Sequence, residues 1–397
     1  MPERIVYLDY NATTPLRPEV KDLMIQAMDV YANASSMHEA GRKAKAEIEK
    51  ARAAVAALID AGDSSTVFFT SGGSESNNTV FMTMYALAKT GSRKKIITTA
   101  IEHPCVLNSA THLKQEGLDV IFLPVDDEGK IDMDVYKREL TDETLLVSIM
   151  AANNEIGTIQ DIGLITKMAK AKGAYVHTDA VQAAGKIPVS VQGWGVDYLT
   201  LSCHKIYGPK GVGALYVREG APIEPLIRGG HQERGVRAGT YNNLGIIGFG
   251  KAAELALAEV DEYGRNIRRL RNMLRDEIVG RIPYVRINGH PTDVLPNTLD
   301  VSFPGAEGES ILLSLDLEGI EVSTGSACAS GSLEPSHVLM ATGVGPELAH
   351  GSIRFSLGKY TTEEDVRYVA EKLPPIIARL RSMSTVSPEE AVGLTRR

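Results

Sequence analysis

The chain has 397 residues, of which 43% are hydrophobic and 23% are charged. This composition is typical of a globular protein and excludes a wholly disordered, collagen-like or disulfide-stapled chain. With 42 basic and 50 acidic side chains, the formal net charge is −8. A chain of this charge lacks the general basic field that attracts proteins to nucleic acid, and we expect no nucleic-acid partner.

The three cysteines, Cys105, Cys203 and Cys328, lie far apart and include no CxxC pair. They cannot form a disulfide framework, and a reducing compartment is the simplest interpretation. The first residues show no signal-peptide pattern, and no apolar run approaches the roughly 18 residues of a membrane span. We therefore expect a cytoplasmic protein without a membrane partner. The nine histidines show no metal-ligand spacing, so we expect no metal site.

The first two-thirds of the chain predict an α/β fold. Two helices are predicted at Pro18–Tyr31 and Glu39–Ile59. Short β-rich runs then alternate with helical patterns, mostly about 20–30 residues apart, which indicates βαβ units and a mostly parallel sheet. The predicted strands are Val67–Thr70, Ile96–Thr99, Val120–Pro124, Leu145–Met150, Ala174–Thr178, Tyr198–Ser202 and Val212–Val217. Only nine residues separate the last two strands, so we expect the last one to run antiparallel to its predecessor.

A second, smaller unit is predicted after a long helical pattern that extends from Leu244 to about Ile282. A helix of that length commonly connects two domains. Beyond it, short strands and helices alternate as in an α+β unit, at Val285–Ile287, Thr298–Ser302, Gly308–Glu318, Glu321–Ser323, Ser352–Ser356 and Thr362–Ser382. We predict a large domain of residues 15–260 and a small domain of residues 1–14 and 261–397.

Polar residues follow five of the predicted strands, where ligands bind in open parallel sheets. One such strand end would mean little, but five together predict a ligand site. The residues are Ser71–Glu75, Glu102–His103, Asn153–Glu155, Asp179 with Gln182, and His204–Lys205.

The segment Ser71–Ser76 leads from a strand into a helix and favours a phosphate, because glycines admit a ligand and the helix N-terminus offers unpaired N–H groups. A tight turn with Ser74 as helix cap is the alternative. Neither a P-loop GxxxxGK[ST] nor a strand-following GxGxxG is present, which disfavours a dinucleotide-binding dehydrogenase.

Several residues admit a structural and a chemical interpretation. His177 lies within a strand and is expected to be structural, whereas Asp179 ends an apolar strand and is either a charged ligand group or a helix cap. Lys205 is either a surface cation or a Schiff-base lysine of lowered pKa, and Lys210 is expected to face solvent.

The remaining cysteines and one arginine are treated the same way. Cys328 lies among small residues at 323–332, which favours a reactive thiol on an exposed loop. Cys105 and Cys203 are expected to be packed. From its strand alone, Arg354 is expected to face solvent, and the alternative is that it binds a substrate carboxylate bidentately.

Taken together, these motifs resemble the cysteine desulfurases of the NifS/IscS type, within the fold-type I pyridoxal 5′-phosphate (PLP) enzymes. The resemblance covers almost the whole chain. Its motifs are YLDYNATTP at 7–15, TSGGSESNN at 70–78, EH at 102–103, NNEIG at 153–157, HTDAVQ at 177–182, SCHKIYGPKG at 202–211, RAGTYN at 237–242, STGSACASGS at 323–332 and SIRFSLG at 352–358. It implies a seven-stranded sheet with one antiparallel strand and a smaller α+β domain that carries the cysteine loop.

The resemblance also implies how PLP would be held. Lys205 would bind it covalently, Asp179 would pair with its ring nitrogen, and Gln182 would hydrogen-bond its ring hydroxyl. His103 would stack on the ring and act in acid–base steps. The phosphate would be held by Gly73, Ser74, Ser202 and His204, with Asn153 also near the cofactor.

The same resemblance implies the substrate contacts and the assembly. Asn153 and Arg354 would bind substrate, with Arg354 on its carboxylate and Asn33 nearby, and Cys328 would be the nucleophile that takes the sulfur. Thr240 would reach the phosphate of a partner subunit, which implies a homodimer.

Four positions depart from the family pattern without removing a reacting group. Ala34 stands where proline often follows Asn33, Ser74 replaces threonine, Tyr241 follows Thr240 in place of glutamate, and Cys105 places a second thiol near the presumed site.

The implied activity is removal of sulfur from L-cysteine, giving L-alanine and a Cys328 persulfide for acceptors such as an iron–sulfur scaffold or a sulfur carrier. A selenocysteine lyase, another PLP aminotransferase and a non-catalytic scaffold are the alternatives. The motifs leave the acceptor open, as they do the choice between cysteine and selenocysteine.

Overall fold

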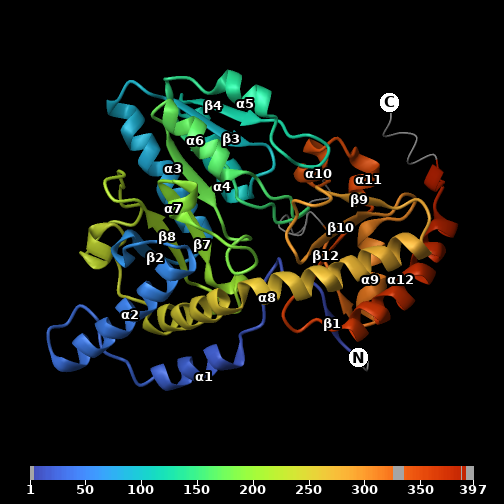
Figure 1. Ribbon diagram of the computed structural model, residues 1–397, viewed down its shortest axis with the longest axis horizontal. Helices are drawn as coiled ribbons and strands as arrows, with labels where there is room; N and C mark the ends of the chain where they lie inside the picture. The colour runs from blue at the N-terminus through green and yellow to red at the C-terminus, as the bar shows by residue number, and fades with distance from the viewer. Residues whose placement is uncertain (1–3, 325–334, 386, 390–397) are drawn as a thin grey trace.

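A computed structural model describes residues 4–324, 335–385 and 387–389. Its main feature is a seven-stranded sheet in the order β2-β8-β7-β6-β5-β3-β4 (Figure 1). The strands are β2 (Val67–Thr70), β3 (Lys95–Thr99), β4 (Asp119–Leu123), β5 (Thr144–Ser148), β6 (Tyr175–Asp179), β7 (Tyr198–Ser202) and β8 (Gly213–Val217). Neighbours from β7 to β4 are parallel, and β8 is antiparallel to both β2 and β7. The predicted α/β class and the antiparallel last strand are confirmed.

Helices cover both faces of this sheet and bury two apolar cores. On one face, α3 (Gly73–Thr90) and α4 (Pro104–Gln115) pack against residues such as Ile96 and Leu146. On the other face lie α2 (Glu39–Leu58), α6 (Ile162–Ala171) and the start of α8 (Asn243–Arg281). The remaining elements of this part are α1 (Pro18–Ala27), α5 (Met133–Glu139), α7 (Val191–Trp194) and the short turns η1 (Ser64–Thr66), η2 (Cys203–Lys205) and η3 (Gln232–Gly235).

The helix α8 (Asn243–Arg281) connects this body to a second one (Figure 1). Its first part contributes Ile246 and Phe249 to the core under the large sheet, and its last part contributes Leu270 and Leu274 to a separate core. The side chain of Asn242 caps its N-terminus by accepting from the Gly245 N–H group. The predicted long connecting helix is confirmed.

The second body is built on a three-stranded antiparallel sheet, β12-β10-β9, and a two-stranded parallel pair, β1 with β11. Val6 and Leu8 contribute to its core, so the first strand packs with residues some 300 positions later in the chain. The domain bounds themselves stay a prediction. The elements are β1 (Val6–Tyr7), β9 (Arg286–Asn288), β10 (Thr298–Ser302), α9 (Gly308–Leu317), β11 (Ile320–Glu321), α10 (His337–Ala341), α11 (Pro346–His350), β12 (Ser352–Ser356) and α12 (Glu363–Met383).

Two absences apply to the part of the chain that the structure describes. None of the helices there combines the length and apolarity that crossing a membrane requires. The described residues also contain no group of three or more His, Cys, Asp or Glu side chains placed to hold a metal ion.

Candidate active site

The carboxyl ends of β2, β3, β6 and β7 bring the predicted site residues to one edge of the large sheet. Asn77, in the first turns of α3 after β2, donates to Asp179 at the end of β6 over 2.7 Å. His103, which follows β3, lies close enough to Asp179 and Lys205 for both charges to affect its pKa. The structure therefore assembles His103, Asp179 and Lys205 in one group.

Asp179 is a buried carboxylate with both oxygens occupied. Its Oδ1 accepts from the Val181 N–H group at 2.9 Å, and its Oδ2 accepts from Asn77 Nδ2. Only 7% of the residue is exposed. A buried carboxylate is costly unless it is hydrogen-bonded, and these two bonds fix the direction of its charge. The sequence left Asp179 as either a charged ligand group or a helix cap. Its Oδ1 caps the following turn, whereas its Oδ2 is bound by the side chain of Asn77 on α3.

His103 caps the N-terminus of α4. Its Nδ1 accepts from the Cys105 N–H group at 3.2 Å. Burial lowers the pKa of His103, the charges of Lys205 and His337 lower it further, and Asp179 opposes them. The ring is therefore neutral near pH 7.

Lys205 closes the turn η2 directly after β7 and points inward. Its Nζ donates to the backbone carbonyls of Asn11 and Ala12, at 2.6 Å each. The interpretation of Lys205 as a surface cation is thus wrong. The turn needs Gly208, because a Cβ there would lie 2.0 Å from Cys203 Sγ. Lys210 is exposed, as predicted.

Around Lys205 lies a polar cluster centred on Asn11, a residue that the sequence analysis left without a role. Gln182 Nε2 donates to the Asn11 carbonyl at 2.9 Å. Lys186 Nζ donates to Asn11 Oδ1 at 3.0 Å and to Gln182 Oε1 at 2.5 Å. Burial, together with the charges of Lys205 and Arg354, lowers the pKa of Lys186 well below its usual value. The YLDYNATTP motif was the available signal for Asn11.

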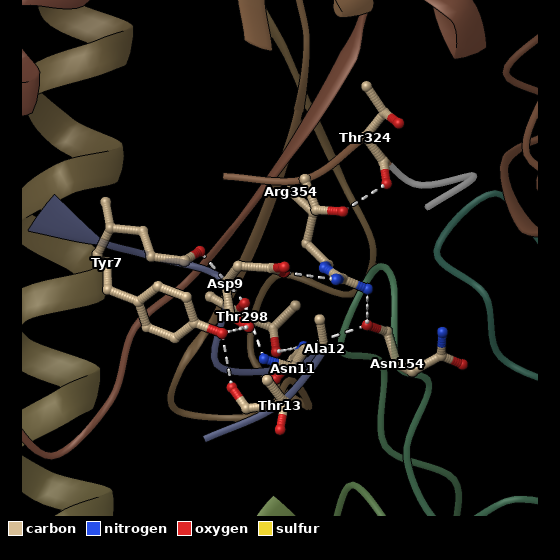
Figure 2. A network of polar contacts seen from close by, with 12 residues as sticks. Tyr7, Asp9, Asn11, Ala12, Thr13, Asn154, Thr298, Thr324 and Arg354 are labelled. Atoms are coloured by element: carbon tan, nitrogen blue, oxygen red, sulfur yellow. Dashed lines mark hydrogen bonds and ion pairs between the residues drawn. The ribbon is translucent and has the colours of Figure 1, made fainter. Parts of the chain in front are cut away.

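Arg354 on β12 is buried, with 2% of the residue exposed, so the solvent-facing expectation is wrong. Its Nη2 donates to Asp9 Oδ1 at 2.8 Å and its Nη1 to the Asn154 carbonyl at 3.1 Å. Figure 2 shows the side chain extending from β12 between these two partners. Its Nε is buried and has no hydrogen-bond partner among the described residues. The reason for the inward direction is the segment around Asp9, which packs against this strand: Asp9 forms a bridge with Ser356.

The predicted phosphate-binding residues surround the N-terminus of α3. This helix has Gly72 at its N-cap without a capping side chain, so Ser74 is not the cap and the first N–H groups have no partner within the helix. A Cβ on Gly73 would lie 3.0 Å from Val181 Cγ2 and 3.8 Å from Ser202 Cβ. His204 stands apart from these residues in its contact: its Nδ1 lies 3.1 Å from Thr13 Oγ1, and burial lowers its pKa to about 4.

Other predicted residues are placed differently. Asn153 is fully buried: its Nδ2 donates to the Ile101 carbonyl at 2.9 Å, and its Oδ1 accepts from the Glu155 N–H group at 2.8 Å. Asn33 and Thr240 are exposed, and no hydrogen bond among the described residues links them to the group around Lys205. Cys328 lies outside the described residues.

Two further carboxyls near the site were among the predicted strand-end residues, but the sequence analysis gave them no individual role. Burial raises the pKa of Glu102 to about 8 and that of Glu155 to about 7. Glu102 Oε1 accepts from Thr99 Oγ1 at 2.9 Å and from the Met150 N–H group at 2.8 Å, which ties the ends of β3 and β5 together. Glu155 accepts from the hydroxyl of Ser336, the cap of α10.

The remaining predicted structural residues behave as expected where the structure describes them. His177 is fully buried between Ser148 Oγ at 2.8 Å and Thr200 Oγ1 at 3.1 Å, and Cys203 is fully buried. Cys105 is partly buried and packs against the core under α3 and α4, as expected, and its Sγ also lies 3.0 Å from His103 Nδ1.

Comparison with known proteins places this arrangement in a family. Residues 6–369 match the aminotransferase class-V family. The chain is 52% identical to the cysteine desulfurase IscS of Dictyoglomus turgidum, over 98% of both proteins. It is 48% identical to the cysteine desulfurase IscS of Methanosarcina thermophila, over 98% of this chain and 95% of that protein.

Solved structures agree with the sequence comparison. A NifS-like protein of 41% identity superposes with a TM-score of 0.89 and covers 95% of this chain and 100% of its own. A NifS-like protein from Rickettsia africae, 36% identical, gives a TM-score of 0.86 over 94% of this chain and 100% of its own. The resemblance drawn from the motifs is thereby confirmed, and the chain belongs to the cysteine desulfurases of the aminotransferase class-V family.

Proposed function

We propose that this chain removes the sulfur of L-cysteine with PLP bound at Lys205, releasing L-alanine and leaving the sulfur as a persulfide on Cys328. The family to which the chain belongs carries the activity. The observation that supports the residue assignment is the group formed by Lys205, Asp179 and His103, which lies at the edge of the sheet where such ligands bind.

The residues of this edge fit PLP in three respects. The uncapped N-terminus of α3 and the hydroxyls of Ser74 and Ser202 suit a phosphate. Gly73 leaves room for a phosphate to approach the backbone closely, and a Cβ at this position would narrow that space. The carboxylate of Asp179 suits a protonated ring nitrogen. When bound, PLP supplies an electron-withdrawing ring that stabilises negative charge at the substrate Cα.

Each side chain of the site would then have its own role in the reaction. Asp179, held by Asn77 and the Val181 N–H group, would keep a ring nitrogen protonated through its negative charge. The Lys205 amine, which donates to the backbone carbonyls of Asn11 and Ala12, would move the Cα proton. His103 would stack on the ring and exchange a proton at its imidazole. Gln182 would donate to the ring hydroxyl through Nε2, which already donates to Asn11.

Arg354 would bind the carboxylate of the substrate. Its buried, unpartnered Nε is the group that an incoming carboxylate oxygen would satisfy. Asp9 and the Asn154 carbonyl hold the rest of the guanidinium, so the donor is fixed before substrate arrives. Asn153 accepts from the N–H groups of Glu155 and Ile156 through Oδ1 and donates to the Ile101 carbonyl through Nδ2. It would support the substrate and cofactor through the backbone shape of the turn at 153–156. His204 would offer a neutral N–H group near the phosphate.

We also propose a homodimer in which Thr240 of one subunit contacts the phosphate in the other. Thr240 is exposed, and so are Tyr31 (87%) and Met37 (89%). The segments are adjacent, since Asn243 Nδ2 donates to the carbonyls of Val30 and Ala32 at 3.2 and 3.0 Å. Asn33 lies in the same exposed segment, where a partner would bring it near the substrate. Large apolar side chains exposed together mark an interface.

The sulfur of Cys328 would pass to an acceptor protein, such as an iron–sulfur scaffold or a sulfur carrier, in the cytoplasm. The test is to supply L-cysteine to the wild-type protein and to Cys328→Ser and to measure alanine, sulfide and protein-bound persulfide. We expect equal amounts of alanine and sulfur from the wild type and no persulfide turnover from Cys328→Ser. Wild-type persulfide formation by Cys328→Ser would contradict the assignment, and a requirement for a 2-oxo acid would indicate a transaminase.

A further inference from the structure

Cys105 is a thiol at the site that the proposed function does not use. It stands in the first turn of α4, with Sγ 3.0 Å from His103 Nδ1 and 3.2 Å from Asn77 Nδ2. Burial and the charge of Asp179 raise its pKa to about 12, although hydrogen bonds from Asn77 and Ser74 partly oppose them. Near neutral pH the group is therefore a thiol that can donate a hydrogen bond, rather than a nucleophilic thiolate.

The direction of the contact between Cys105 and His103 follows from the backbone. The Cys105 N–H group donates to His103 Nδ1 at 3.2 Å, and a backbone N–H group cannot accept. Nδ1 is therefore the unprotonated nitrogen of the neutral ring, and the proton lies on Nε2. It follows that the Cys105 S–H group donates to the same Nδ1.

Asn77 completes a chain of hydrogen bonds to Asp179. One amide hydrogen of its Nδ2 points to Asp179 Oδ2 at 2.7 Å and the other to Cys105 Sγ at 3.2 Å. The opposite amide orientation would set the Asn77 oxygen against the Asp179 carboxylate. The oxygen Oδ1 of Asn77 is instead buried, without a partner among the described residues. The Asp179 carboxylate thus determines the orientation of the Asn77 amide, and that amide in turn holds the Cys105 thiol in place.

We propose that Asn77 and Cys105 are positioning residues that connect Asp179 to His103 and hold His103 as the neutral tautomer with its proton on Nε2. The chain would link the group expected to pair with the ring nitrogen to the group expected to stack on the ring. The His103 ring would then present an N–H donor to the reacting atoms. The tautomer follows from the described contacts alone, and only its consequence for catalysis rests on the proposed function.

The Cys105 thiol is one of several groups that affect the pKa of His103. Burial, Lys205 and His337 favour the neutral ring, and Asp179 favours the protonated one. A donor to Nδ1 disfavours protonation of that nitrogen. Cys105→Ala removes this donor, so the pKa of His103 should rise by about 0.5–1 unit, the amount that one hydrogen bond represents. Cys105→Ser keeps a donor and should stay near the wild type.

The experiment is ¹⁵N NMR of the full-length protein with labelled histidine, with and without PLP, followed across the pH range. His103→Phe identifies the His103 signal. His112→Gln, an exposed change on the same helix, serves as the control for α4. We expect an unprotonated Nδ1 and a protonated Nε2 in the wild type and Cys105→Ser, and a raised pKa in Cys105→Ala.

A protonated Nδ1 in the wild-type protein would overturn the proposal even if no variant folds. Equal His103 titration in Cys105→Ala and the wild type would overturn it as well. The pH profile of desulfuration gives a second readout, whose acidic limb should move to higher pH in Cys105→Ala and return in Cys105→Ser. An inactive wild type that shows the expected tautomer would count against the proposed function and leave the tautomer standing.

Discussion

Two buried histidines show how the interior of the large sheet differs from its edge. His177, inside β6, has a hydroxyl on each ring nitrogen, and burial lowers its pKa to about 3. His103, beyond β3, is held through Nδ1 and faces the charges of Asp179 and Lys205. Both ring nitrogens of His177, inside the sheet, have hydrogen-bond partners, so this ring contributes to stability. Among the described residues, only Nδ1 of His103, at the edge, is held by such contacts, and we assign the proton exchange to its Nε2.

Two lysines repeat this contrast. Lys186 is fully surrounded by protein and donates to the side-chain oxygens of Asn11 and Gln182. Lys205 donates to backbone carbonyls at the sheet edge. The positions of Lys186 and Lys205 in the sequence do not tell which of them is structural, but the groups around each amine do. Buried, satisfied groups indicate structure, whereas groups held in place at the edge indicate function.

The same substitution at both histidines should separate the interior of the sheet from its edge. His103→Phe keeps a ring but no proton-exchanging nitrogen, so kcat should fall by about 10²–10⁴-fold, with a modest loss of stability from the missing helix cap. His177→Phe leaves the hydroxyls of Ser148 and Thr200 unpaired, which should cost about 1–3 kcal/mol in the free energy of unfolding.

Steady-state kinetics and denaturant unfolding of both variants provide the measurement. The activity per folded molecule of His177→Phe should stay close to the wild-type value. If His177→Phe loses more catalytic rate than His103→Phe does, the division between interior and edge is wrong.

A second prediction concerns Arg354, which lies at the boundary between structure and substrate. In Arg354→Lys the fork-shaped donor is lost while the charge stays, so KM for L-cysteine should rise by about tenfold or more, with a smaller change in kcat. Initial rates over a range of cysteine concentrations check this. Asp9→Asn provides the matched control, because it weakens the support of the guanidinium without removing it and should raise KM less.

The smallest expected effect concerns Glu102. Burial raises its pKa to about 8, above the value of about 4.3 in an unfolded chain. Between these two values the unfolded state loses its proton first, so the stability that the protonated group contributes is lost as the pH rises. Glu102→Gln keeps an oxygen for Thr99 and the Met150 N–H group and cannot ionise.

Thermal unfolding at several pH values tests this. The melting temperatures of Glu102→Gln and the wild type should converge near pH 4, and the variant should be the more stable by several degrees near pH 8. Parallel curves over that range would mean that Glu102 is already ionised in the folded protein.

The sequence predicted the parts of the molecule that depend on local pattern. The seven strands of the large sheet, the antiparallel β8 and the connecting helix follow from hydrophobic runs and from the spacing between them. His103, Asp179 and Lys205 could be named because polar residues at the ends of parallel strands must meet at one edge. The family motifs then assigned roles that spacing alone left open.

Non-local contacts explain what could not be predicted. The pair β1–β11 involves two residues in each strand, too few for a periodic signal. The inward direction of Arg354 depends on Asp9, 345 positions earlier. Lys186 meets Asn11 across 175 positions. Cys105 was expected to be packed, but its role depends on an amide of α3 whose orientation only the fold determines.

We expect Lys205 to be the amine that binds PLP, and covalent mapping can identify that amine. The protein is incubated with PLP, reduced with borohydride, digested and examined by mass spectrometry. We predict the mass of a phosphopyridoxyl group on Lys205, and its absence from Lys186 and Lys210. Labelling of Lys186 in place of Lys205, or an unlabelled chain, would rule out Lys205 as the PLP-binding amine.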